Sequence, residues 1–136
     1  MYIKTKRLLI RKFEHKDLQA VYAYTSDIHV MKYIPKGVFT EEAAKEFINQ
    51  NMGDQAEKFP VILIDENILI GHIFFAQYFG EHTYEIGWVF NPNYYNKGYA
   101  SEAANAMIEF GFEKMKLHRI IATCQPENIP SYRVVG

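Results

Sequence analysis

One short segment of this sequence combines residue types and spacing that suit the binding of an anion. Residues 96–100 read Asn-Lys-Gly-Tyr-Ala and lie between a strand-like run, residues 83–90, and a helical pattern that starts at Gly98. The first turn of a helix carries about four backbone N–H groups without internal partners, and the helix dipole adds roughly half a positive charge there. Gly98 has no side chain, so a ligand can approach the backbone closely. The segment predicts a phosphate or pyrophosphate site, with an ordinary strand-to-helix connection as the alternative.

The spacing of apolar residues predicts the elements that hold this segment. Alternating or continuous apolar runs predict strands at residues 8–13, 59–64, 68–78, 83–90 and 117–124. Apolar residues three or four positions apart predict helices at residues 16–24, at 40–53 and from 98 onward, and residues 126–131 read as the start of another. We therefore expect an α/β (α+β) fold, in which a mixed sheet with an antiparallel meander is flanked by helices.

The composition limits the class of protein. With 136 residues, 49% of them apolar, the chain fits one globular domain that spans residues 1–136. A net charge of −1 gives no global field that would attract nucleic acid. The single Cys124 cannot form an intramolecular disulfide, and the five histidines show no close metal-ligand spacing, so we expect no metal. No signal-peptide core and no apolar run of membrane-spanning length occurs, which favours a cytoplasmic protein without a membrane partner.

Five ordered motifs resemble the GCN5-related N-acetyltransferase (GNAT) family and, within it, the ribosomal-protein N-acetyltransferases. They are Thr-Lys-Arg-Leu-Leu-Ile-Arg at residues 5–11, Glu-Ile-Gly-Trp at 85–88, Asn-Pro at 91–92, Asn-Lys-Gly-Tyr-Ala-Ser-Glu-Ala at 96–103 and Asn-Ile-Pro-Ser at 128–131. The resemblance implies that an amine attacks the thioester of acetyl-coenzyme A (acetyl-CoA) directly, without a covalent acyl-enzyme and without a metal. The expected acceptor is the α-amine of a protein N-terminus or the amine of a small molecule.

The resemblance also implies which residues contact acetyl-CoA. The backbone of residues 87–90 would face the pantetheine arm and polarise the thioester carbonyl, and residues 95–100 would wrap the pyrophosphate. The family usually has Gln or Arg where this chain has Tyr95, whereas Gly98 and Ala100 match its turn. A place in the hydrophobic core is the alternative for Trp88, and a solvated position is the alternative for Lys97. The predicted cofactor-binding residues are Trp88, Val89, Phe90, Tyr95, Asn96, Lys97, Gly98, Tyr99, Ala100, Ser101 and Asn128.

Glu85 is the candidate catalytic base. A lysine-type amine with a pKa of about 10.4 is almost wholly protonated at pH 7, so freeing its lone pair costs roughly 4 to 5 kcal/mol, against about 1 kcal/mol for an α-amine. Strand alternation places Glu85 on the same face as Gly87 and Val89, and opposite Ile86 and Trp88. The small Gly87 beside it leaves room for a cleft. A solvated or salt-bridged strand residue is the alternative.

Ser131 is the candidate catalytic donor to the departing thiolate. Many family members have a tyrosine seven residues after the asparagine that corresponds to Asn128, but this chain has Val135 there. The resembled branch has a serine three residues after that asparagine, which matches Ser131. Tyr132 ranks second as the donor, and a helix cap is the alternative role of Ser131. Glu102 would repel a bound pyrophosphate from the first helical turn, so we expect a structural role for it.

The C-terminal end leaves the full activity open. Family members continue through a Gly-Phe pair and two further strands, whereas this sequence ends at Gly136. The last predicted strand would then have an exposed edge, which favours pairing with another chain. A homodimer, an unstable protein and a fragment of a longer protein are the alternatives. A non-catalytic acetyl-CoA-binding or interaction domain and a nucleotide-binding module are the alternative functions, and the sequence does not determine the acceptor.

Overall fold

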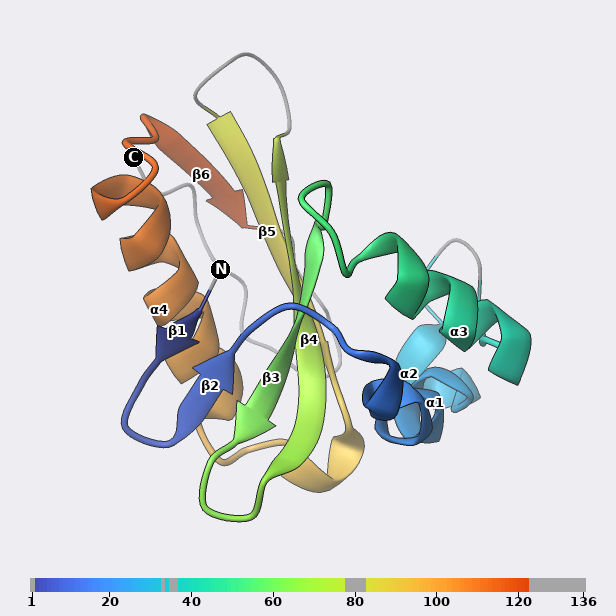
Figure 1. Cartoon of the computed structure of the whole chain (residues 1–136). Coiled ribbons are helices and arrows are strands. Elements are labelled where there is room, and N and C mark those ends of the chain that lie inside the picture. Colours follow the sequence, from blue (N-terminus) through green and yellow to red (C-terminus); the bar gives the residue numbers. More distant parts are fainter. Residues whose placement is uncertain (1, 33, 35–36, 78–82, 123–136) are drawn as a thin grey trace.

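The computed structural model of the chain describes residues 2–32, 34, 37–77 and 83–122. Its strands are β1 (Ile3–Lys4), β2 (Leu8–Ile10), β3 (Lys58–Leu63), β4 (Ile68–Gln77), β5 (Thr83–Phe90) and β6 (Arg119–Ala122). Its helices are η1 (His15–Asp17), α1 (Leu18–Thr25), α2 (Ile28–Met31), α3 (Glu41–Gln50), η2 (Pro92–Tyr94) and α4 (Tyr99–Glu113), where η marks a 3₁₀ helix. The strands form one sheet in chain order with helices on both sides, which confirms the predicted fold class (Figure 1).

The sheet changes from antiparallel to parallel pairing at β5. Each neighbouring pair from β1 to β5 is antiparallel, whereas β6 runs parallel to β5. Two parallel neighbours need a crossover connection, and α4 provides it. The chain therefore enters α4 at the end of β5 and returns along the same edge of the sheet as β6. This arrangement places the predicted anion-binding turn at one end of β5.

A bulge in β4 determines which side chains reach each face of the sheet. Val61 of β3 is opposite Gly71. The next residue of β3, Ile62, is opposite Leu69, so β4 has one extra residue, Ile70, at this point. Leu69 consequently faces one hydrophobic cluster, while Ile70 packs in the cluster on the other face.

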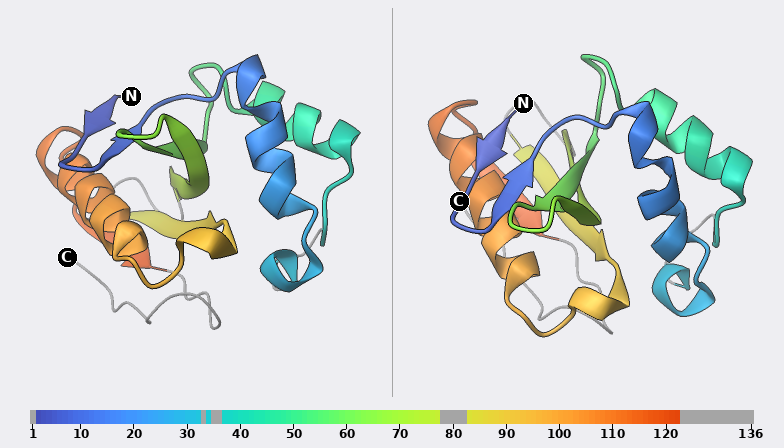
Figure 2. Two further views of the ribbon diagram at one scale, coloured as in Figure 1. Left: turned by 90° about the horizontal axis from the view of Figure 1, so that it is seen from below. Right: turned by 60° about the horizontal axis from the view of Figure 1, so that its bottom comes forward.

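The sheet separates these two clusters. α4 covers one face, where Ala103, Ala104 and Met107 are fully buried against the strands. The helices α1, α2 and α3 cover the other face, where Tyr24 and Ile48 are buried (Figure 2). Each cluster removes apolar surface from water, which is the main favourable contribution to folding. The two layers together hold β4 and β5 in the middle of the molecule.

Several predicted elements are confirmed closely. The strands predicted at residues 59–64 and 83–90 are β3 and β5 with ends that differ by one residue at most. The strand predicted at 68–78 is β4, and its predicted last residue lies outside the described residues. Thr40 caps α3 as predicted, because its Oγ1 accepts a hydrogen bond from the N–H of Ala43 at 3.1 Å. The helix predicted at residues 16–24 is found as η1 followed directly by α1, whereas β1, α2 and η2 are short elements that the sequence pattern did not predict.

The strand predicted at residues 8–13 is wrong beyond Ile10. The chain leaves the sheet there, because the guanidinium of Arg11 forms two 2.9 Å hydrogen bonds with the carboxylate of Asp17 at the start of the helical layer. Phe13 is buried among the helices rather than in the sheet. The strand predicted at residues 117–124 begins only at Arg119, and its last two residues, like the predicted helix at 126–131, lie outside the described residues.

Candidate cofactor site at the start of helix α4

The strand that leads to the candidate site ends where its sequence predicts. Phe90 is the last residue of β5, and Asn91 begins η2 by accepting a hydrogen bond on its side chain from the N–H of Asn93 at 3.0 Å. Pro92 lacks an N–H group and cannot continue the strand ladder. The chain therefore turns sharply away from the sheet at this point.

The turn into α4 contains two residues in the left-handed region of the backbone. Asn96 has a φ of 62° and Gly98 a φ of 80°, and these two residue types adopt that region at the lowest cost. The first α-helical hydrogen bond of α4 runs from the N–H of Glu102 to the carbonyl of Gly98 at 3.0 Å. The N–H groups of Tyr99 and Ala100 precede this bond and have no acceptor inside the helix. The predicted helix start is confirmed, and its geometry suits an anion; anion binding itself stays a prediction.

Side chains from the N-terminal segment hold this turn. The carboxylate of Glu102 accepts hydrogen bonds from the hydroxyl of Thr5 at 2.5 Å, from the backbone N–H of Arg7 at 3.0 Å and from Nε of Arg7 at 2.6 Å. The Arg7 guanidinium also donates to the carbonyl of Lys97 at 3.1 Å and lies 4.5 Å from the centre of the Tyr99 ring. Burial acts to raise the pKa of Glu102, but the hydrogen bonds from Thr5 and Arg7 outweigh it and lower that pKa. The structural role predicted for Glu102 is confirmed.

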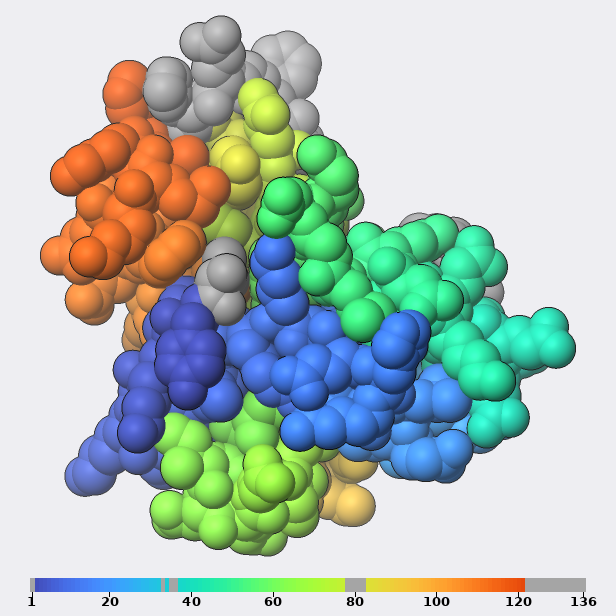
Figure 3. Space-filling model, in the orientation of Figure 1, coloured from blue at the N-terminus to red at the C-terminus, as the bar shows by residue number. Residues whose placement is uncertain are grey.

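Thr5 and Arg7 are residues of this site that the sequence reasoning missed. Both lie in the N-terminal motif at residues 5–11, which carried the family resemblance but no assigned role. Their contacts with Glu102 join residues separated by 97 and 95 positions. Figure 3 shows this N-terminal segment, in dark blue, against the lower part of α4, in orange. The one signal in the sequence that could have led to them is Glu102, because a carboxylate at a predicted anion site needs a basic partner elsewhere in the chain.

Among the described residues, β5 has neighbouring strands on both sides only along its first half. β4 pairs with residues 84–90, whereas β6 pairs with residues 83–86. Within the described part of the chain, β6 ends at Ala122, which is opposite Ile86. The second half of β5 therefore reaches the turn beyond the last pairing with β6 that the structure describes.

Backbone groups along this second half point alternately toward and away from β4. The N–H of Asn91 donates to the carbonyl of Ile70 in β4 at 2.8 Å. Because successive residues of a strand alternate in the direction of their N–H and C=O groups, Val89 also faces β4. The same alternation directs the backbone groups of Trp88 and Phe90 to the opposite edge. That edge is the one that adjoins the parallel strand β6.

The side chains of β5 alternate as predicted. Trp88 is 1% exposed and packs with Ile86 and Phe90 in the cluster under α4, whereas Val89 packs in the cluster on the other face. The core alternative is thus confirmed for the side chain of Trp88. Glu85 is partly exposed and lies between Ala76 of β4 and Ile121 of β6.

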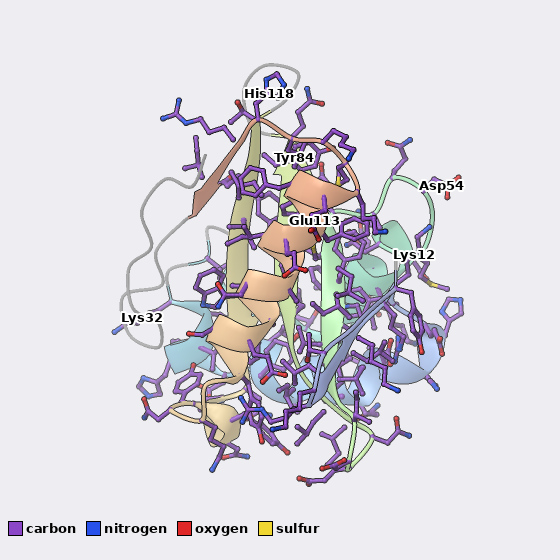
Figure 4. All side chains as sticks on the ribbon, turned by 90° about the vertical axis from the view of Figure 1, so that its left-hand side faces the viewer. Lys12, Lys32, Asp54, Tyr84, Glu113 and His118 are labelled. Atoms are coloured by element: carbon purple, nitrogen blue, oxygen red, sulfur yellow. The ribbon has the colours of Figure 1, made fainter. Side chains whose placement is uncertain are left out.

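Glu85 lies far from the predicted anion-binding turn along β5. Phe90 is five positions after Glu85 along β5, which is about 16 Å at the rise of a strand. Figure 4 shows the neighbouring Tyr84 at the same end of the molecule as Glu113, the last residue of α4, whereas the turn precedes the first residue of that helix. A ligand that contacts both the turn and Glu85 must be long and extended.

Two predicted residues, Asn128 and Ser131, lie outside the described residues. A surface cavity of about 280 Å³ lies elsewhere, between η1, α1 and α3, and none of the predicted site residues is among its lining residues His15, Leu18, Lys45, Ile48 and Asn49. Among the described residues, no group of three His, Cys, Asp or Glu side chains is arranged to hold a metal ion. No helix in the same part of the chain is long and apolar enough to cross a membrane.

Known proteins share both the sequence and the architecture of this chain. Residues 7–136 match the model of the acetyltransferase (GNAT) domain family. The uncharacterized N-acetyltransferase YnaD of Bacillus subtilis (strain 168) is 78% identical over 135 residues, which cover 99% of this chain and 79% of that protein. The crystal structure of a GNAT-family acetyltransferase from Bacillus anthracis has a TM-score of 0.90 and 73% identity, and the match covers 97% of this chain and 78% of that one.

A more distant structure shares the fold. The spermidine N-acetyltransferase from Vibrio cholerae, in complex with CoA and spermine, has a TM-score of 0.72 at 22% identity, and the match covers 87% of this chain and 71% of that one. None of these similarities supports the non-catalytic alternative. The chain belongs to the GNAT family and is an acetyl-CoA-dependent acetyltransferase.

Proposed function

We propose that this chain transfers the acetyl group of acetyl-CoA to a primary amine by direct attack of the amine within a ternary complex. The observation that carries the proposal is the junction of β5 and α4. It combines a turn with two left-handed residues, a helix start whose first N–H groups have no helical acceptor, and a strand edge that leads away from the turn. An anionic pyrophosphate suits the helix start, and an extended pantetheine arm suits the strand edge.

The pyrophosphate would bind at the turn. The N–H groups of Tyr99 and Ala100 would donate hydrogen bonds to phosphate oxygens, and the positive end of the helix dipole would favour the negative charge. The exposed Lys97 would add a cation at the rim. The proposed set at this turn is Tyr95, Asn96, Lys97, Gly98, Tyr99, Ala100 and Ser101.

The thioester would lie farther along β5. Backbone N–H groups directed away from β4 would donate a hydrogen bond to the thioester carbonyl and stabilise the negative charge that forms on its oxygen during attack. The backbone direction favours Trp88 and Phe90 over Val89 for this role. Asn128 remains a proposed pantetheine contact because of the family motif in which it occurs.

The chemistry requires one base and one hydrogen-bond donor. The lone pair of the acceptor nitrogen attacks the carbonyl carbon, and the carbonyl π electrons move to the oxygen. Before attack, Glu85, directly or through a water molecule, accepts the proton that blocks this lone pair in the ammonium form of the acceptor. After attack, the positively charged nitrogen of the intermediate loses a proton to solvent. The electrons on the oxygen then reform the carbonyl as the C–S bond breaks. The hydroxyl of Ser131 donates a hydrogen bond to the departing thiolate, which takes its proton from solvent.

The acceptor would be either an α-amine of a peptide or an amine of a small molecule such as a polyamine. The distant spermidine N-acetyltransferase was determined with spermine, which supports including polyamines among the candidates. An α-amine needs less help from a base, since its pKa of about 8 leaves a measurable fraction unprotonated at pH 7. The two classes therefore make different demands on Glu85.

Release of free thiol from acetyl-CoA tests the proposed function. Purified protein is incubated with acetyl-CoA and, separately, with an alanyl peptide, spermidine, spermine or lysine, and thiol is measured against reactions without an amine. We expect amine-dependent release with at least one acceptor. Tight CoA binding without release for any amine would contradict the transferase proposal. Thermal stabilisation by ATP but not by CoA would instead support a nucleotide-binding module.

The Glu85→Gln variant should lose about 10²-fold in kcat, because the amide cannot accept the proton. The loss should be larger with spermidine than with an alanyl peptide, since the polyamine nitrogen is more basic. Glu109→Gln is the matched control, because Glu109 is an exposed residue in the middle of α4. Equal rates for Glu85→Gln and Glu109→Gln would remove Glu85 from the mechanism.

A further inference from the structure

The position of Glu102 presents an electrostatic problem for the proposed cofactor site. Glu102 lies in the first turn of α4, four residues after Gly98. A carboxylate there stabilises the helix through the dipole, but it also repels any anion that binds to the same helix start. Pyrophosphate and carboxylate would therefore compete for the same positive end of the helix. A fixed cation beside the carboxylate would remove this conflict.

Arg7 supplies that cation in a fixed geometry. Its Nε lies 2.6 Å from one oxygen of Glu102, and its backbone N–H donates to the other oxygen at 3.0 Å. Thr5 donates to that second oxygen as well. The side chains of Arg7 and Glu102 are 40% and 20% exposed, so the pair is partly shielded from water. Several hydrogen bonds, rather than a single exposed ion pair, hold the two charges together.

The same guanidinium reaches the left-handed turn. It donates to the carbonyl of Lys97, which lies between the two left-handed residues. It also lies over the ring of Tyr99, the first residue of α4. A Cβ added at Gly98 would lie 3.3 Å from a terminal nitrogen of Arg7, which shows how closely the guanidinium approaches the turn. Arg7 thus contacts the turn before, at and after the start of the helix.

We propose that Arg7 is a positioning residue for the cofactor: it offsets the charge of Glu102 and holds residues 97–99 in the conformation that receives the pyrophosphate. The inference rests on the proposed function, because it assumes that the pyrophosphate binds at this turn. It assigns Arg7 no contact with the reacting atoms. Arg7 instead strengthens the binding of the part of acetyl-CoA that carries the phosphates.

The planar fork of arginine is required for these contacts. One guanidinium serves Glu102, the Lys97 carbonyl and the Tyr99 ring at the same time. A lysine at position 7 would keep the charge near Glu102 but could not make all three contacts, because its ammonium is a single point on a flexible chain. Arg7→Lys should therefore bind CoA more weakly than the wild type, but more tightly than a variant with an uncharged residue at position 7.

A double-mutant cycle that removes the two charges, measured by calorimetric titration of CoA, tests the proposal. Arg7→Met should raise the Kd for CoA about tenfold, because the charge of Glu102 is then unbalanced beside the phosphates. Adding Glu102→Gln to Arg7→Met should recover part of the affinity, since the repelling charge is gone while the contacts of Arg7 with Lys97 and Tyr99 are still missing. In turnover, the KM for acetyl-CoA should rise about tenfold in Arg7→Met, while kcat at saturating acetyl-CoA stays within about twofold.

Two controls separate this effect from loss of structure. Pantetheine lacks every phosphate of CoA, so its Kd should be the same for the wild type and Arg7→Met. Lys6→Met removes the same charge from the adjacent residue, whose side chain is exposed, and should leave the Kd for CoA within about twofold. Circular dichroism confirms that each variant is folded at the temperature of the titration.

The outcomes distinguish failure of the inference about Arg7 from failure of the proposed function. A double variant that binds CoA as weakly as Arg7→Met would overturn the inference, because Arg7 would then not be offsetting Glu102. Equal weakening of CoA and pantetheine would overturn it as well, since the effect would not concern the phosphates. A wild-type protein that binds no CoA would overturn the proposed function, and the inference with it. If the wild type binds CoA and Arg7→Met binds it with the same Kd, the inference is overturned while the proposed function stands.

Discussion

The free energy of unfolding should fall by about 1.4 kcal/mol for each unit of pH below pH 6, because of one buried histidine. His72 lies in β4 and is 6% exposed. Its Nδ1 is 2.6 Å from the hydroxyl of the fully buried Tyr24, and the ring of Phe47 lies 5.0 Å away, centre to centre. Burial, with a smaller contribution from the charge of Lys58, lowers the pKa of His72 from 6.5 to about 3.

The sign follows from the two pKa values. In the unfolded chain His72 takes up a proton as the pH falls through 6.5, whereas in the folded protein it stays neutral down to about pH 3. Between these values the unfolded state binds one proton more than the folded state, so acid favours unfolding. Above pH 6.5 this residue contributes no pH dependence. The stability that depends on neutral His72 is therefore present at neutral pH and lost through the window from 6.5 to about 3.

Urea unfolding at a series of pH values between 4 and 7 measures this slope. Carboxylates also titrate in that range, so the informative quantity is the free energy of unfolding of the wild type minus that of His72→Gln. This difference should fall by about 1.4 kcal/mol for each pH unit as the pH drops below about 6. His29→Gln is the control for loss of a histidine, because His29 is exposed on α2. Parallel curves for the wild type and His72→Gln would contradict the prediction. Tyr24→Phe should lower stability while it keeps the slope, since His72 remains buried.

Gly71→Ala should destabilise the protein by about 3 kcal/mol, although most exchanges of Gly for Ala outside strained positions are neutral or favourable. A Cβ at Gly71 would lie 2.6 Å from the carbonyl oxygen of Val89 and 2.9 Å from the Cα of Phe90. Both atoms belong to the backbone of β5 and cannot rotate away as a flexible side chain would. The strand that carries the proposed thioester contacts must therefore move or separate from β4.

Two measurements check this prediction. Urea unfolding gives the loss of stability, and CoA titration should show weaker binding, because the displaced backbone at Val89 and Phe90 belongs to the proposed site. Gly53→Ala is the matched control: no heavy atom lies within 4 Å of its added Cβ, and its φ is not in the left-handed region. The prediction is contradicted if Gly71→Ala and Gly53→Ala have the same stability within about 0.5 kcal/mol.

The elements around the site could be predicted because their signals are local. Thr40 caps a helix through a residue three positions away, and Pro92 ends a strand through its own missing N–H. The start of α4 depends on Gly98 and on the apolar spacing that follows it. Each of these signals is complete within a few residues. The family resemblance then added the cofactor, which the local physics alone left as an unspecified anion.

Other features could not be predicted because they depend on residues far apart in the chain. The bulge at Ile70 moves Leu69 to the side of the sheet that α1 and α3 cover. The pattern of apolar residues within β4 does not predict this bulge. The hydrogen bond between Tyr24 and His72 joins α1 to β4 across 48 positions. The strand predicted at residues 8–13 failed for a different reason: Asp17, the partner of Arg11, is only six positions away but lies in the helical layer, and strand alternation does not indicate this.

By itself, the sequence determined the order of the elements, the turn at residues 96–100 and the family to which the chain belongs. These follow from hydrogen bonds, backbone preferences and motifs that act over short distances along the chain. Only the tertiary structure decided what surrounds that turn. Arg7 meets Glu102 because β2 and α4 bury apolar side chains in the same cluster on one face of the sheet. Burial of that shared face brings the two charges together, and no local spacing encodes it.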